Sequence, residues 1–213
     1  MTNRNGVWRS LELWRASAFL LAGIILAINA VIVAAEMVVG VERWRVLGQI
    51  FVGAGWTAAF IGLLGLYPGL ADGSRWLARA GALFAAIGAV VFTVMGLASF
   101  VFYAGIVDGS LTTLVPLFLP GVIIGSILGF VSISAASLRV DVHSRTLGLL
   151  LLLPPTMVIL NLLTAIVGIE SAMSTLAVVI GDTLAMLAIG MSVRGSDPST
   201  DYTEAESSSD LGV

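Results

Sequence analysis

Six long apolar segments hold nearly all of this chain between short charged clusters, and they constrain its fold more than any other feature. About 20 residues of α-helix cross a bilayer hydrocarbon core of about 30 Å, and every segment reaches that length. The segments cover residues 16–39, 47–66, 77–103, 117–138, 147–169 and 172–193. We therefore predict an all-α fold: a polytopic transmembrane bundle of six helices over residues 16–194.

The composition agrees with a membrane environment and excludes several chemistries. Of 213 residues, 58% are hydrophobic and 11% are charged, whereas a soluble domain has about 25% charged residues. The chain has no cysteine, so it forms neither disulfides nor thiolate metal sites. All ten basic residues are arginines, so no lysine can form a Schiff base. We expect no cofactor, no metal site and no nucleic-acid partner.

The arginines are distributed unequally between the two predicted sides of the bilayer. If the N-terminus is cytoplasmic, that side receives Arg4, Arg9, Arg15, Arg75, Arg79, Arg139, Arg145 and Arg194. The other side receives Arg43 and Arg45. Because cytoplasmic loops carry the excess of basic residues, this distribution predicts that both termini are cytoplasmic, in a multi-pass protein of the cell (plasma) membrane.

The two ends of the chain differ from the body. Within residues 1–15, Val7, Leu11 and Trp14 share one helical face, which predicts a cytoplasmic amphipathic segment lying along the interface. The alternative is a basic flank that only sets the topology. Residues 195–213 contain five acidic residues and a serine cluster. Such a sequence cannot bury enough apolar area to offset its ordering entropy, so we predict a disordered acidic cytoplasmic tail.

Asp182 is the most unusual residue, because it lies near the middle of the sixth apolar segment without an adjacent positive charge. An ionised carboxylate at the bilayer centre costs about 2.5–3.5 kcal/mol on insertion scales. Two interpretations remain open. The carboxyl group is a proton or cation site, or it is a protonated acid that forms hydrogen bonds between helices.

Five other polar residues of the apolar segments are candidate neighbours of Asp182. They are Asn29 and Glu36 in the first segment, Asn161 and Thr164 in the fifth, and Thr175 in the sixth. Their positions predict a polar cleft between the first, fifth and sixth spans that opens outward. The alternative is that they join helices through hydrogen bonds, each contributing about 0.6 kcal/mol.

Glycines and prolines mark special places in the fourth and fifth segments. Gly121, Gly125 and Gly129 form a small-residue face, which packs either inside the chain or against a second copy or a membrane-protein partner. Two prolines near the start of the fourth segment predict partly irregular backbone over residues 111–119. Pro154 and Pro155 remove two backbone donors and predict a kink in the fifth span. The alternative is a broken helix whose free carbonyls could face a substrate, as in transporters.

No complete catalytic motif is present. The residues Ile180-Gly181-Asp182 only partly match the Gly-x-Gly-Asp pattern of presenilin-like proteases, and no second mid-membrane aspartate exists to complete a dyad. The single histidine, His143, lies in a predicted loop with Asp141, where two ligands are too few for a metal site. We therefore do not expect an enzyme.

Part of the sequence resembles the small multi-pass membrane proteins of halophilic archaea. The resemblance is carried by arginine without lysine, by the acidic serine-containing tail, and by residues 64–72 (LGLYPGLAD) leading into residues 75–81 (RWLARAG). These families are largely uncharacterised, so the resemblance implies a membrane fold and no functional residue.

Together these observations predict a non-enzymatic membrane protein, most simply an accessory or scaffold protein. Its expected partners are the lipid bilayer and a second copy or another membrane protein. The alternative is a small transporter, or a proton- or cation-coupled carrier, that uses Asp182.

Overall fold

The computed structural model describes residues 6–40, 42–107, 115–140, 144–169 and 171–195, which form helices and no strand. Six spans among them are long and apolar enough to cross a membrane, which confirms the predicted all-α, six-span class. Three spans are single helices: α1 (Gly6–Val39), α2 (Glu42–Leu70) and α3 (Arg75–Tyr103). The fourth span contains α4 (Val115–Val122), the π-helix η2 (Ile123–Gly129) and α5 (Phe130–Arg139). The fifth contains α6 (Arg145–Leu150) and α7 (Leu153–Val167), and the sixth is α8 (Ala172–Gly195).

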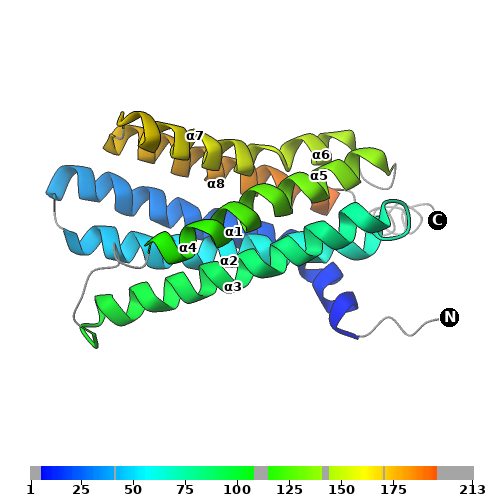
Figure 1. Ribbon diagram of the computed structural model, residues 1–213, viewed down its shortest axis with the longest axis horizontal. Coiled ribbons are helices and arrows are strands. Elements are labelled where there is room, and N and C mark those ends of the chain that lie inside the picture. The colour runs from blue at the N-terminus through cyan, green and yellow to red at the C-terminus, as the bar shows by residue number, and fades with distance from the viewer. Residues whose placement is uncertain (1–5, 41, 108–114, 141–143, 170, 196–213) are drawn as a thin grey trace, which may run out of the picture.

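The spans alternate in direction, so the chain connections gather at the two ends of the bundle (Figure 1). One end holds the start of α1, the α2–α3 connection, the α5–α6 connection and the end of α8. We call it the arginine-rich end, because the arginines of the described residues there are Arg9, Arg15, Arg75, Arg79, Arg139, Arg145 and Arg194. The opposite end holds Arg43 and Arg45.

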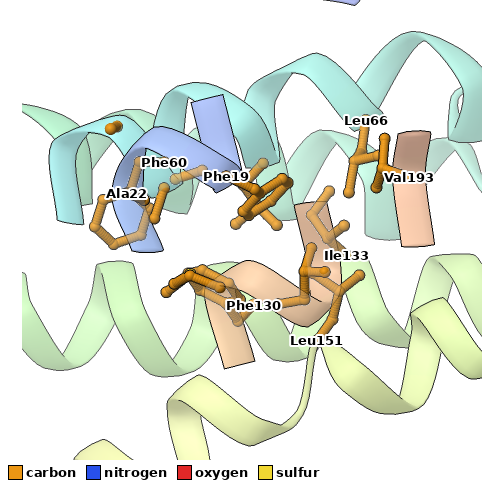
Figure 2. Close-up of a cluster of buried hydrophobic side chains, with 14 of the residues drawn as sticks. Phe19, Ala22, Phe60, Leu66, Phe130, Ile133, Leu151 and Val193 are labelled. Carbon is orange, nitrogen blue, oxygen red and sulfur yellow. The ribbon is translucent and has the colours of Figure 1, made fainter. Parts of the chain in front are cut away.

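Aromatic side chains from α1, α2, α3 and α5 form the centre of the core (Figure 2). Phe19, Phe60 and Phe130 are fully buried. The ring of Trp56 stacks on Phe92 with 5.3 Å between centroids. The Phe60 ring fits between α2 and α3 because Gly88 of α3 has no side chain. A Cβ on Gly88 would lie 2.5 Å from the end of this ring.

The glycine face of the fourth span is filled inside the chain. A Cβ on Gly125 would overlap the backbone of Gly88 in α3, and Gly121 faces the Val91 side chain. Gly129 lies against Ala85 of the same helix. This face is therefore not free for a second copy or a partner protein, and the alternative of packing within the chain describes it.

The fourth span is irregular at its centre. Of residues 111–119, those up to 114 lie outside the described part of the chain, and those from 115 onward belong to α4. The irregular hydrogen bonding instead occupies η2. Pro120 removes a backbone donor just before η2, and weak helix formers such as Gly125 and Gly129 follow.

The fifth span is divided into two helices, a larger disruption than the predicted kink. α6 ends at Leu150, and Pro154 and Pro155 occupy the first turn of α7. Proline is tolerated there because the first N–H groups of a helix have no intrahelical partner. α7 ends at Val167, and Gly168 caps it with a φ of 71°, the left-handed conformation that glycine adopts without strain.

The N-terminal segment forms the first turns of α1, and Figure 1 shows these turns pointing away from the bundle. The ring of Trp8 lies against Tyr67 near the end of α2, with 5.0 Å between centroids. Gly65 of α2 packs closely against the backbone of Leu11. The segment is thus continuous with the first span. Of the predicted tail over residues 195–213, Gly195 is the last residue of α8, and residues 196–213 lie outside the described part of the chain.

Candidate intramembrane polar site

Asp182 lies in the middle of α8 and is 6% exposed. Ten residues separate it from the start of the helix at Ala172, a distance of about 15 Å along the axis. The neighbouring Thr183 is also buried, and its hydroxyl donates to the Val179 carbonyl 2.8 Å away. Asp182 therefore sits at the depth of the bilayer centre, on the face of α8 that packs against the rest of the bundle.

The packing of α8 against α1 places Asn29 at the same level as Asp182. Gly23 of α1 faces Leu187, and Gly190 of α8 faces Leu20. Three residues forward along α8 therefore correspond to three residues backward along α1, which is the register of two antiparallel helices. Continuing this register by five residues brings Asp182 level with position 28 of α1. Asn29 is the adjacent residue, and it is 1% exposed. The two residues thus lie at one level near the middle of the bundle.

Both residues carry a buried side-chain oxygen without a hydrogen-bond partner, Oδ1 in each case. The Asn29 oxygen points toward α2, where a Cβ on Gly48 would lie 3.0 Å from it. A neutral carboxylic acid has one O–H donor, and an amide oxygen is an acceptor. No hydrogen bond joins the two side chains in the structure, so each has unused hydrogen-bonding capacity at this level of the bundle.

The other predicted neighbours lie elsewhere. Glu36 forms an ion pair with Arg45 across the α1–α2 turn, with 3.0 Å between Arg45 Nε and Glu36 Oε1. Asn161 and Thr175 are exposed. The Thr164 hydroxyl donates to the Asn161 carbonyl at 2.8 Å, and that of Thr175 donates to the Ser171 carbonyl at 3.3 Å. Of the six residues, only Asn29 and Asp182 are buried at one level.

Two features of the structure were not found from the sequence. The Glu36–Arg45 pair is one, and its signal was available: nine residues separate the two across a tight turn at Gly40, whose φ is 67°. The other is a pair of hollows along α2 and α3, neither of which is lined by Asn29 or Asp182. These hollows depend on helix packing, which periodicity alone does not specify.

Within the described residues, no group of three histidine or carboxylate side chains could hold a metal ion. The chemistry that the polar pair can perform is limited to hydrogen bonding and to holding a proton or a small cation at its oxygens.

The fold and this polar pair support a multi-pass α-helical membrane protein. No protein-family model matches the chain, and neither a curated protein nor a solved structure is detectably similar to it.

Proposed function

We propose that this chain is a non-enzymatic accessory or scaffold protein of the cell membrane, which works by binding a neighbouring membrane helix along α7. In this proposal both termini are cytoplasmic, with the arginine-rich end inside. Asp182 and Asn29 then strengthen the contact between α8 and α1.

The first support is the sparse packing of the fifth span. Among the described spans it is the least buried: 17% of its most apolar 18 residues are buried, against 56% for the span formed by α2. α7 packs mainly against α8, at the edge of the bundle (Figure 1). Most of its surface is therefore available to lipid or to another helix.

The observation that carries the proposal is Asn161, which is exposed on this outer helix. Six residues, about 9 Å, separate it from the end of α7 at Val167, so its amide lies within the hydrocarbon. In the described part of the chain, its side chain has no hydrogen-bond partner. An amide in lipid without a partner is costly, and polar side chains in such positions join helices.

Cross-linking through single cysteines tests the proposal, since the chain has no cysteine of its own. Leu160→Cys places a thiol beside Asn161, and Leu83→Cys places one on the exposed face of α3 as a matched control. In native membranes, we expect oxidation or a photoactivatable thiol reagent to give a discrete adduct at position 160 and not at position 83. A disulfide-linked dimer would identify the partner as a second copy.

The same experiment with Asn161→Leu added shows whether the amide is responsible. We expect this substitution to remove most of the adduct at position 160, because the interhelical hydrogen bond is lost while the apolar surface is kept. Equal adducts at positions 160 and 83, or an adduct that survives Asn161→Leu, would contradict the proposal.

A second candidate function, a proton- or cation-coupled carrier, is favoured by one observation: the unpartnered oxygens of Asn29 and Asp182 at mid-membrane. Ionisable residues at this depth mark ion pathways in many membrane proteins. The test that separates the two functions uses Asp182 variants and is given in the Discussion.

A further inference from the structure

A groove runs along the membrane-facing surface of α2, which is recessed between α1 and α3. Its floor contains Gly53, Ala54 and Ala58, and its walls include Ile25 of α1 and Leu97 of α3. The groove has a volume of about 430 Å³. It is narrow at the base because a Cβ on Gly53 would lie 2.6 Å from the Cα of Gly96 in α3.

Among the described residues that line the groove, the polar side chains are Thr57 and Thr93, whose hydroxyl groups form hydrogen bonds within the protein. Thr57 and Thr93 approach each other to 3.1 Å across the α2–α3 contact. Each is also 2.7 Å from a carbonyl of its own helix, at Gly53 and Ala89 respectively. These hydroxyls have no spare donor for a ligand, so the groove suits a hydrocarbon chain.

A second hollow, of about 290 Å³, lies where the same seam reaches the opposite end of the bundle. Arg43, Trp44, Leu47 and Tyr103 line it. Leu47 and Ile50 of the groove are three residues apart, as are Tyr103 and Phe100, so one face of each helix carries both hollows. The axial distance from Arg43 to Thr57 is about 21 Å, enough for a headgroup and one leaflet of about 15 Å.

The second hollow carries a positive charge. The guanidinium carbon of Arg43 lies 4.8 Å from the centre of the Tyr103 ring, and no carboxylate among the described side chains pairs with it. Arg45, the other arginine at this end, is already paired with Glu36. A guanidinium binds phosphate oxygens through two parallel hydrogen bonds, and tryptophan and tyrosine favour the headgroup region.

We propose that these two hollows form one binding site for a phosphate-bearing lipid, in the leaflet at the end of the bundle that holds Arg43 and Arg45. The phosphate lies at Arg43, between Trp44 and Tyr103, and one acyl chain follows the groove along α2 toward Thr57. A guanidinium that pairs with no carboxylate among the described side chains, directly above an apolar groove of leaflet length, matches the charge and the shape of such a lipid.

Native mass spectrometry of the full chain in detergent tests the site. The probes are phosphatidylglycerol and a diacylglycerol with the same acyl chains, which lacks the phosphate. We expect Arg43→Gln to weaken phosphatidylglycerol binding about tenfold, the loss of a charge-assisted hydrogen bond, without changing diacylglycerol binding. Ala54→Phe fills the groove, so it should weaken the binding of both probes.

Two matched variants serve as controls. Arg45→Gln removes the paired arginine of the same end, and Ala86→Phe adds a ring to the exposed face of α3 outside the groove. Both should leave binding within twofold of wild type, and circular dichroism checks that all four variants are folded. Equal losses for Arg43→Gln and Arg45→Gln, or wild-type binding by Ala54→Phe, would overturn the proposal. A change in oligomeric state with Ala54→Phe, without loss of lipid, would also overturn it, because a second copy would then occupy the groove.

Discussion

At the scale of single residues, Asp182 and Asn29 are two polar residues that lie at one level near the middle of the bundle, each with a buried side-chain oxygen that has no hydrogen-bond partner. Their burial is a cost unless they bond to each other or serve a transported ion, since an unpaired buried polar group costs about 1–3 kcal/mol. The matched register of α1 and α8 places them at one level. The accessory role and the carrier role therefore make different predictions for the same carboxyl group.

Asp182→Asn distinguishes these roles, because asparagine keeps the size and the hydrogen-bonding capacity but cannot exchange a proton. For the accessory role we expect the free energy of unfolding to change by less than about 1 kcal/mol. Asp182→Leu should cost about 1–3 kcal/mol, because Asn29 loses its polar neighbour. Thermal unfolding in detergent measures both values, and Thr175→Val, at an exposed position, is the control.

Vesicle flux completes this test. The accessory role predicts that wild-type protein and Asp182→Asn give the same proton flux as empty vesicles under a pH gradient. A wild-type flux that Asp182→Asn abolishes, with the fold unchanged, would establish the carrier and reject the accessory role.

At the scale of helices, contacts between glycines determine how closely α3 approaches its neighbours. Gly53 of α2 meets Gly96 near one end of α3, and Gly125 of η2 meets Gly88 nearer its middle. Both contacts bring backbone against backbone, which favours dispersion and weak Cα–H hydrogen bonds where lipid removes the usual hydrophobic driving force. The small residues of α2, α3 and the fourth span therefore serve the fold of the single chain.

Gly125→Ala tests this role, since the added methyl group would overlap the Gly88 backbone. We expect a loss of about 1–3 kcal/mol, the usual cost of overpacking, seen as a lower melting temperature in detergent. Gly195→Ala is the matched control, because a Cβ there would meet no atom within 4 Å. If the glycine face instead bound a partner, Gly125→Ala would change association and leave the melting temperature of the isolated chain as in wild type.

At the scale of the whole molecule, the two ends differ in charge, and the proposed orientation follows from that difference. Ser74→Cys lies at the arginine-rich end and Ser171→Cys at the opposite end, both with little change in side-chain size. In intact cells, we expect an impermeant maleimide to label position 171, and to label position 74 only after the membrane is opened. Labelling of position 74 in intact cells would reverse the orientation.

Much of the architecture followed from the sequence alone. Apolar segments of spanning length predict the six spans, because a backbone in lipid must satisfy its hydrogen bonds within a helix. The prolines at 154 and 155 marked the interruption of the fifth span, since missing N–H groups act locally. The depth of Asp182 likewise followed from counting residues along one helix.

What the tertiary structure decided is which faces meet. The sequence placed Asn161, Thr164 and Thr175 on helical faces. Only packing determines that Asn161 is exposed on α7 and that Glu36 pairs with Arg45. The packing of the glycine face of the fourth span and the apolar groove on α2 likewise depend on how α3 packs against its neighbours. These spans are apolar both where they are buried and where they are exposed, so hydrophobic periodicity, which orients helices in water, carries little information about orientation within a membrane.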